Sequence, residues 1–307
     1  MRKIVVLLLL FSCSKSPEDK EGMIDVRGTS LYYHVIGKGE PVIIIHGGPM
    51  LDQSYLFDHF KALAKDHVLI FYDQRVSGKS SPVADSTSLT MANMTNDIEV
   101  IREKLGLDQV HVIGHSWGGF LAAKFAGEHP TKVKSLILCD AMPPTQRLWQ
   151  QEESEIAKRA TAYDSTVRDA IMNLDAFKNR SDVTLVDSLM KVSFKNQFVD
   201  TTKLSKLKVK LPKDYFQRSK IFSYIGREFY AFDITEQLKR IIAPTLIIYG
   251  DQEPALKISA PVYQSNITGS SVVIIKQSGH FPFIEQPEEF KRTVEEFWRS
   301  VERESRH

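Results

Sequence analysis

Short apolar runs recur along the chain, and segments with helical periodicity lie between them. The apolar residues in these runs are continuous rather than alternating, which indicates strands that are covered on both faces. The order strand, helix, strand therefore predicts an α/β fold with a mostly parallel central sheet flanked by helices. The predicted strands are residues 31–36, 42–45, 68–72, 110–113, 136–138, 246–249 and 272–275, and the predicted helices are residues 55–64, 91–105, 120–128 and 287–301.

The alternation stops between residues 143 and 232, where the sequence is polar and helical and has no comparable β-branched run. A segment of this length is too long for a loop inside a compact domain. We therefore predict a helical cap formed by residues 143–232. It is inserted into a core formed by residues 23–142 and 233–307.

The amino terminus has the layout of an export signal. A basic start precedes an apolar stretch, Ile4 to Phe11, that is too short to span a bilayer. The next residues, Ser12-Cys13, complete a segment that resembles the lipobox of bacterial lipoproteins, although Phe11 stands where a small residue is usual. On this interpretation residues 1–12 are a signal peptide and residues 13–22 are a lipidated tether. The protein would then be an exported lipoprotein, anchored to a membrane of the bacterial cell envelope through Cys13.

The alternative is an ordinary signal peptide that leaves Cys13 as a free thiol. The second cysteine, Cys139, lies in an apolar run and is predicted to be a small buried side chain. The 40 Lys and Arg residues nearly balance the 38 Asp and Glu residues. No nucleic-acid partner is therefore predicted, because binding nucleic acid needs a concentrated basic face.

A glycine-flanked serine carries the clearest chemical signal. Gly114-His115-Ser116-Trp117-Gly118-Gly119 directly follows the predicted strand 110–113 and precedes a helical pattern. In a tight strand-to-helix turn, small residues two positions either side of the serine let the helix pack back on the strand. The serine hydroxyl then projects above the sheet. The motif predicts Ser116 as a catalytic nucleophile.

A serine hydroxyl needs a general base, and the base needs an acid that orients it. After a turn of this kind the acid and then the histidine follow in the chain. His280, which comes after the last predicted strand, is the predicted base. Gly250-Asp251-Gln252-Glu253-Pro254 follows the strand 246–249 and offers two acids. The usual spacing selects Glu253, with Asp251 as the alternative.

The oxyanion of an acyl-transfer intermediate needs backbone N–H donors. Trp117, directly after the serine, is predicted to supply one of them. The other is predicted to come from His46-Gly47-Gly48-Pro49 after the strand 42–45, with Gly48 favoured and Gly47 as the alternative. We predict that His46 and His115 support the site rather than act as bases.

These motifs together resemble the α/β-hydrolase family, and more closely its proline iminopeptidase branch. The resemblance spans about residues 23–301 and rests on HGGP at 46–49, DQRVSGKS at 73–80, GHSWGG at 114–119 and GHFPFIEQPEEF at 279–290. It implies an α/β-hydrolase fold with a helical cap. It also implies a serine hydrolase, without metal or other cofactor, that removes an amino-terminal residue from short peptides or hydrolyses amino-acid amides.

Three positions depart from the family pattern. Met50 and Val76 stand where glycine is usual, so the pocket beside the oxyanion loop is expected to differ. The acid Glu253 stands where aspartate is usual. Arg75, within the DQR motif, is predicted to pair with a carboxylate and brace its loop.

Members of this branch bind the free α-ammonium group of the substrate with carboxylates on the cap. The resemblance therefore implies such carboxylates here, and the candidates are Glu152, Glu153, Glu155 and Glu228. We favour Glu153 and Glu228 as the residues that bind the substrate amine.

A carboxylesterase or lactonase with the same triad is the alternative function, because cap residues rather than the triad select the acyl group. A third possibility, a non-catalytic binding protein on the same scaffold, would be expected to lack a member of the triad. None is missing here.

Overall fold

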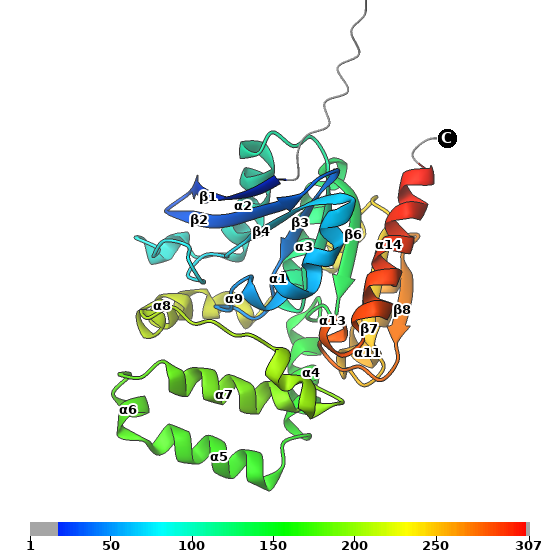
Figure 1. Cartoon of the computed structure of the whole chain (residues 1–307). Helices are drawn as coiled ribbons and strands as arrows, with labels where there is room; N and C mark the ends of the chain where they lie inside the picture. The colour runs from blue at the N-terminus through cyan, green and yellow to red at the C-terminus, as the bar shows by residue number, and fades with distance from the viewer. Residues whose placement is uncertain (1–17, 305–307) are drawn as a thin grey trace, which may run out of the picture.

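The computed structural model describes residues 18–304, and a single sheet forms its centre (Figure 1). The sheet has eight strands in the order β1-β2-β4-β3-β5-β6-β7-β8. β2 pairs antiparallel with β1 and β4, and all other neighbouring strands are parallel. The strands are β1 (Glu18–Val26), β2 (Thr29–Gly37), β3 (Glu40–Ile45), β4 (His67–Tyr72), β5 (Val110–His115), β6 (Val133–Cys139), β7 (Thr245–Gly250) and β8 (Ser271–Ile275).

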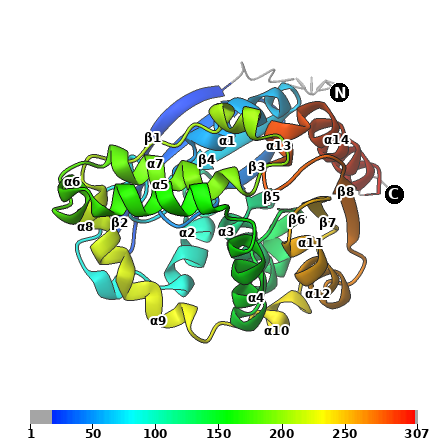
Figure 2. The same cartoon turned by 90° about the horizontal axis from the view of Figure 1, so that it is seen from below.

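Helices lie on both faces of the sheet and over one edge (Figure 2). The core helices are α1 (Ser54–Phe60), α2 (Met91–Lys104), α3 (Trp117–Glu128), α10 (Thr235–Leu238), α11 (Ala255–Ile258), α12 (Ala260–Asn266), α13 (Pro282–Glu285) and α14 (Pro287–Glu304). The helices of the insertion are α4 (Gln146–Ala157), α5 (Ala162–Asn173), α6 (Asp175–Lys178), α7 (Thr184–Lys195), α8 (Tyr215–Phe222) and α9 (Gly226–Phe229).

Strand β3 shows why the strand sequences are apolar without alternation. Ile43 and Ile45 belong to the core beneath α2, α3, α10 and α12, whereas Val42 and Ile44 belong to the core beneath α1 and α14. Successive side chains of a strand point to opposite faces, so both sets must be apolar. The predicted α/β architecture with a mostly parallel sheet is confirmed.

The first half of strand β1, residues 18–22, was not expected from the sequence. Residues 18–22 pair with β2 from Glu18 opposite Gly37 onward, so the predicted tether through residue 22 is wrong for this part. β1 is one of the two edge strands of the sheet. Edge strands commonly carry charged side chains, which is why the polar EDKEG segment can be a strand although it reads as a linker.

The predicted signal peptide (residues 1–12), the lipidation site Cys13 and the tether up to residue 17 lie outside the described residues. Within residues 18–304, no helix combines the length and the apolar character that crossing a bilayer requires.

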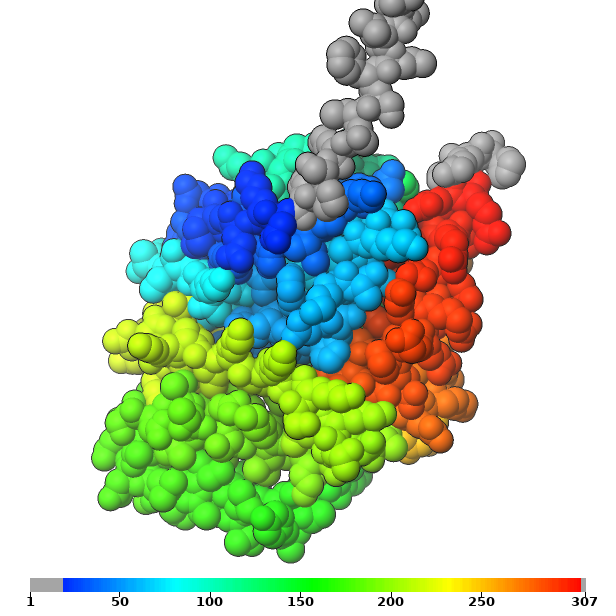
Figure 3. Space-filling view, viewed as in Figure 1, coloured from blue at the N-terminus to red at the C-terminus, as the bar shows by residue number. Residues whose placement is uncertain are grey.

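The insertion between β6 and β7 forms a helical layer beneath the core (Figure 3). An isolated bridge between Thr145 and Asp233 closes its base, one residue before α4 begins. Helices α5 and α7 lie side by side at the outside of this layer (Figures 1 and 2). The insertion thus leaves and rejoins the core where β6 ends, beside the turn that follows β5.

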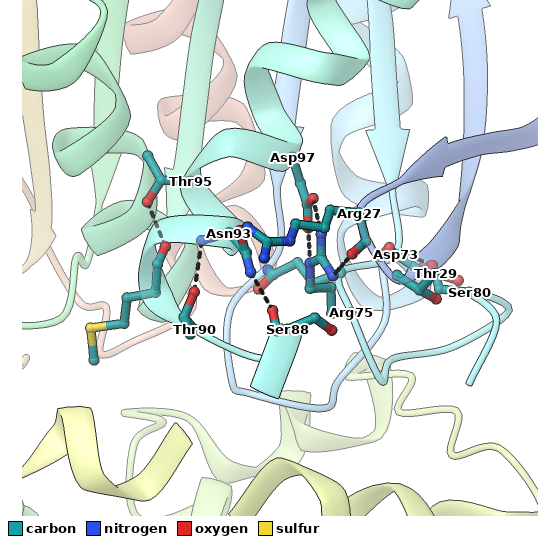
Figure 4. A network of polar contacts seen from close by, with 12 residues as sticks. Arg27, Thr29, Asp73, Arg75, Ser80, Ser88, Thr90, Asn93, Thr95 and Asp97 are labelled. Carbon is teal, nitrogen blue, oxygen red and sulfur yellow. Dashed lines mark hydrogen bonds and ion pairs between the residues drawn. The ribbon is translucent and has the colours of Figure 1, made fainter. Parts of the chain in front are cut away.

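A buried ion pair fixes the loop after β4 (Figure 4). The guanidinium of Arg75 contacts Asp97 of α2 at two points, Nε to Oδ2 at 2.6 Å and Nη2 to Oδ1 at 2.7 Å. Its Nη1 also donates to the carbonyl oxygen of Arg27. The predicted bracing role of Arg75 is confirmed, and the loop that it holds also carries Gln74, which reaches the active-site turns.

Replacing Arg75 with methionine is expected to lower the free energy of unfolding by about 3–5 kcal/mol, because it leaves the Asp97 carboxylate buried without its partner. Equilibrium unfolding in urea measures this change. Arg168→Met is the matched control, since it removes an exposed pair with Asp169 and should cost less than about 1 kcal/mol. Equal losses in the two variants would contradict the bracing role.

Candidate active site

The turn that carries Ser116 joins β5 to α3. Ser116 has φ 55° and ψ −123°, a region that a non-glycine residue enters only at an energetic cost. A Cβ atom on Gly114 would lie 2.2 Å from the carbonyl oxygen of Gly118, so the turn needs a glycine there. The Ser116 N–H donates to the carbonyl of Cys139 at the end of β6, at 3.0 Å. Of residues 111–120, Ser116 alone is not buried, and it faces the cavity described below.

His280 follows β8 and lines the same cavity as Ser116. Its Nδ1 lies 3.3 Å from Oε2 of Glu253, whose side chain is fully buried. The structure thus brings together the predicted base and the favoured acid. Asp251 instead accepts a hydrogen bond from the N–H of Ser278 at 3.3 Å, which ties its own loop together. A serine, an imidazole and a carboxylate in this order can carry out acyl transfer.

Opposing effects set the pKa of His280. Burial is the largest single effect and lowers it, whereas the carboxylates of Glu253, Asp140 and Glu153 together raise it by more. The net result is a pKa above the usual value of a histidine. The Glu253 carboxylate thus favours the protonated form of His280, as a base that takes a proton from a serine would require.

The loop that carries His280 is tied to the cap. The His280 N–H donates to the carbonyl oxygen of Gln197 at 2.9 Å. The buried Glu285 carboxylate accepts hydrogen bonds from Gly279 at 2.7 Å, from Val199 at 2.9 Å and from Asp200 at 3.0 Å. Sequence reasoning missed Glu285, although an acid directly after the apolar residues FPFI of its motif was an available signal.

Buried hydrogen bonds link His280 to the glycine-rich loop after β3. His115 Nε2 contacts the His280 carbonyl at 2.8 Å, and His115 Nδ1 contacts the Tyr55 hydroxyl at 2.7 Å. The Gly47 N–H donates to the same hydroxyl at 2.6 Å. Burial lowers the pKa of His115 well below its usual value. A neutral imidazole with its proton on Nε2 satisfies all three contacts, so His115 acts as the expected support.

The loops after β3, β4 and β5 are also joined to one another. Gln74 N–H donates to His46 Nε2 at 3.0 Å, and the Trp117 indole N–H donates to the Gln74 side-chain oxygen at 3.0 Å. Burial lowers the pKa of His46 to about 4. His46 is therefore a neutral acceptor in this network, in line with its predicted supporting role.

Two backbone N–H groups remain to receive an oxyanion. The Gly47 N–H is engaged by Tyr55, which removes the alternative donor. Gly48 has φ 48° and lines the cavity, and its N–H has no acceptor within residues 18–304. Trp117 is the first residue of α3, where N–H groups lack acceptors within the helix. Gly48 and Trp117 can thus stabilise negative charge beside Ser116.

The cavity over Ser116 lies between core and cap and has a volume of about 520 Å³. Most of its wall is apolar, and the aromatic side chains in it are Tyr55, Trp117, Trp149, Phe194, Phe222, Phe229, Tyr230 and Phe281. In the described part of the chain no lysine or arginine lines it, whereas Glu152 and Glu153 do. Nor do residues 18–304 contain a cluster of three or more metal-ligating side chains that could hold a metal ion.

Helix α4 directs one face of the cap into this cavity. It begins after Thr145, whose side chain accepts a hydrogen bond from the N–H of its third residue. Trp149, Glu152, Glu153 and Ile156 follow at helical spacing and all line the cavity. Glu152 is buried and Glu153 is exposed, so only the second is open to a ligand that enters from solvent.

Glu228 does not lie in the cavity. Its carboxylate accepts a hydrogen bond from Met91 N–H at 2.8 Å, at the first residue of α2. A helix amino terminus has unpaired N–H groups and partial positive charge, which hold an acid there. The expectation that Glu228 binds the substrate amine is therefore wrong. The sequence could not show this, because the next residues, Phe229 and Tyr230, do line the cavity.

Met50 and Val76 both have a positive φ angle, a backbone conformation that favours glycine. Their φ angles are 74° and 59°, and both side chains are buried in the core. Neither residue lines the cavity, so the expected difference in the pocket does not come from their side chains.

Comparison with known proteins agrees with this architecture. The family described as alpha/beta hydrolase fold matches residues 40–287. A proline iminopeptidase from Heyndrickxia coagulans is 31% identical over 295 residues, which cover 92% of this chain and 99% of that protein. The crystal structure of a proline iminopeptidase from Mycobacterium smegmatis superposes with a TM-score of 0.68 at 21% identity, over 93% of this chain and 100% of that chain. A thermophilic esterase from Thermogutta terrifontis superposes with a TM-score of 0.62 at 23% identity, over 92% and 99% of the two chains.

Replacing Glu253 with glutamine is expected to lower kcat/KM by about 10²- to 10⁴-fold, because an amide does not stabilise the imidazolium. Initial rates on an arylamide or ester that the wild type hydrolyses measure the loss. Asp251→Asn, in the same loop, is the matched control and should leave kcat/KM nearly unchanged. A larger loss for Asp251→Asn would assign the acid to Asp251 instead.

Proposed function

The chain belongs to the alpha/beta hydrolase family and, within it, to the proline iminopeptidase family, and we propose that this serine hydrolase removes the amino-terminal residue from short peptides or amino-acid amides. The observation that carries the proposal is electrostatic. The cavity over Ser116 presents the cap carboxylate of Glu153 and, among its described lining, no lysine or arginine. The free α-ammonium group of a substrate is a cation, and in a partly dry pocket it needs such a partner.

In the proposed reaction the Ser116 hydroxyl oxygen attacks the carbonyl carbon of the first residue, and its proton passes to His280. Gly48 and Trp117 N–H groups hold the oxyanion. When the intermediate collapses, the C–N bond breaks and the leaving amine takes the proton from His280. Water then attacks the acyl-enzyme by the same route and releases the amino-terminal residue.

The shape of the cavity supports a small substrate. A volume of about 520 Å³ lies in the range of small-ligand sites, roughly 300–1,000 Å³. Residues of the core and of the cap both line the cavity, so the cap limits the size of a substrate that can reach Ser116. The aromatic wall suits an apolar side chain or ring next to the ammonium group.

A carboxylesterase or lactonase is the second candidate function. The same aromatic wall that suits an apolar residue also suits an uncharged acyl group. The triad and the oxyanion donors would serve both reactions. Whether activity depends on Glu153 therefore distinguishes the aminopeptidase from the esterase.

We expect the full chain, purified in detergent, to hydrolyse proline arylamide and to lose this activity when the proline nitrogen is acetylated. The physical reason is that only the free amine carries the positive charge that Glu153 binds. Release of the arylamine reports the rate, and Ser116→Ala is the blank. Glu153→Gln should raise KM for the free-amine substrate by about 10-fold or more, the value of a hydrogen bond to a charged group.

Glu155→Gln is the matched control on the same helix, because Glu155 pairs with Lys158 and does not line the cavity. It should leave KM unchanged. Equal turnover of the free and the acetylated arylamides, or hydrolysis of esters alone, would contradict the aminopeptidase and favour the esterase.

We further propose that the protein is an exported lipoprotein held on a bacterial envelope membrane by acyl chains on Cys13. The sequence around Cys13 supports this, since a short apolar segment after a basic start ends at the cysteine. Several acyl chains, at about 0.8 kcal/mol for each buried CH₂ group, would hold the protein firmly on the membrane.

In a bacterial host that processes lipoproteins, the wild-type chain is expected to incorporate a labelled fatty acid and to sediment with membranes. Cys13→Ser should lose the label, because no thiol is left at the acylation site. Cys139→Ser removes the buried thiol of the core and should keep the label. An unlabelled wild type, or a Cys13→Ser variant that keeps the label, would contradict the anchor.

A further inference from the structure

A groove lined by lysines lies at the end of the sheet that is remote from Ser116. It has a volume of about 430 Å³ and lies between β1, β2, the starts of β3 and β4, and the end of α2. Lys20, Lys38 and Lys104 line it, and its other lining residues in the described part of the chain are all apolar or glycine. The groove therefore combines positive charge with apolar walls.

The groove lies beside the point where the described chain begins. Glu18 pairs with Gly37, which lines the groove, and Lys20 pairs with Val35, which also lines it. Cys13 comes five residues before Glu18, and a chain of five residues spans at most about 18 Å. Acyl chains on Cys13 would therefore hold this end of the molecule close to a membrane.

We propose that this groove is the membrane contact of the anchored protein, in which Lys20, Lys38 and Lys104 bind the anionic head groups of bilayer phospholipids and keep the cap turned away from the membrane. The inference rests on the proposed anchor at Cys13 and does not depend on the reaction at Ser116. It gives the protein a second interaction surface and a fixed orientation.

The charges around the groove suit an anionic ligand. All three lysines are exposed, and none forms an ion pair with another described side chain. Two neighbouring acids have other partners, since Glu40 pairs with Lys134 at 3.0 Å and Glu103 lies 3.7 Å from Arg102. Phospholipid head groups supply the anions that lysines near a membrane surface bind. The glycerol and first methylene groups of the same lipids would contact the apolar walls.

The topology separates this groove from the catalytic cavity. Val68 of the groove pairs with Pro41, near the starts of two parallel strands, whereas Ser116 directly follows β5 of the same parallel set. A strand of six residues spans about 20 Å, so the serine lies at the opposite end of the strands. Figure 1 shows the cap beyond that end, below the sheet, with β1 at the top. A membrane at the groove therefore leaves the cavity facing the aqueous compartment, where soluble peptides rather than bilayer lipids reach it.

The cap carries a second group of lysines, which offers a matched control. Lys206, Lys210 and Lys213 are exposed, and none of them forms an ion pair with another described side chain. They equal the groove lysines in number and charge, but they belong to the cap and lie far along the chain from Cys13. A membrane contact through these lysines would turn the cap toward the bilayer.

The test measures which end of the molecule lies near the bilayer. The full chain, made in a bacterial host that processes lipoproteins, is placed in phosphatidylglycerol vesicles that contain a lipid with an energy-transfer acceptor on its head group. A donor fluorophore is attached at Gln109→Cys, an exposed position directly before β5, or at Asn179→Cys, an exposed position directly after α6 of the cap. The groove variant combines Lys20→Gln, Lys38→Gln and Lys104→Gln, and the cap variant combines Lys206→Gln, Lys210→Gln and Lys213→Gln.

With the wild-type lysines, energy transfer from position 109 should exceed that from position 179. The groove variant should lose most of this difference, because the acyl anchor alone does not fix the orientation, whereas the cap variant should keep it. Salt at about 1 M, where the Debye length is about 3 Å, should act like the groove variant. Equal or greater transfer from position 179 with the wild-type lysines, or a groove variant that keeps the full difference, would overturn the inference.

The mass of the purified chain separates failure of the anchor from failure of the groove. If Cys13 carries no acyl chains, the anchor proposal fails, and co-sedimentation of the same chain with phosphatidylglycerol vesicles decides the groove. The groove variant should then bind about 100-fold more weakly than the cap variant, since each lysine near an anionic surface contributes roughly fivefold. Equal sedimentation of the two variants would overturn the inference. Hydrolysis of a soluble substrate should be the same in both variants, and its absence in the wild type would count against the proposed reaction alone.

Discussion

The backbone turn at Ser116 is the constraint on which the rest of the site depends. A non-glycine residue at φ 55° costs about 1–3 kcal/mol and persists only where the surroundings enforce it. Here β5 is buried between β3 and β6, and a Cβ atom on Gly118 would lie 2.2 Å from the carbonyl oxygen of Ile45. The same crowding places the oxyanion loop after β3 beside the serine. The central position of β5 in the sheet therefore explains both the strained backbone at Ser116 and the nearness of the loop after β3.

Of the three histidines around Ser116, two are neutral. His46 and His115 are buried and neutral, and each holds a loop in place through its ring nitrogens. In the proposed reaction, the positive charge that develops is therefore carried by His280 and faces Glu253. The cap is tied to this arrangement at residues 199–200, whose N–H groups donate to the buried carboxylate of Glu285 together with Gly279 of the His280 loop. Buried hydrogen bonds consequently join the cap to the core beside His280.

The sequence patterns predicted those features that depend on residues close together in the chain. The parallel strands follow from continuous apolar runs, and the serine turn follows from glycines that close packing requires, as Gly114 shows. Residues 18–22 of strand β1 escaped prediction because their charged side chains, which an exposed edge strand tolerates, are also typical of a linker. Glu228 was misjudged for a different reason. It is a helical acid with ordinary neighbours, and only the packing of the cap decides that it meets the amino terminus of α2.

The central claim is that Ser116 and His280 act as one catalytic unit, and non-additivity tests it most directly. The measurement is kcat/KM for Ser116→Ala, His280→Ala and the double variant on one substrate. If the two residues share a single proton transfer, either substitution removes the whole contribution, and the double variant should be about as slow as each single variant. Losses that multiply in the double variant would show that the residues act independently and would contradict the account.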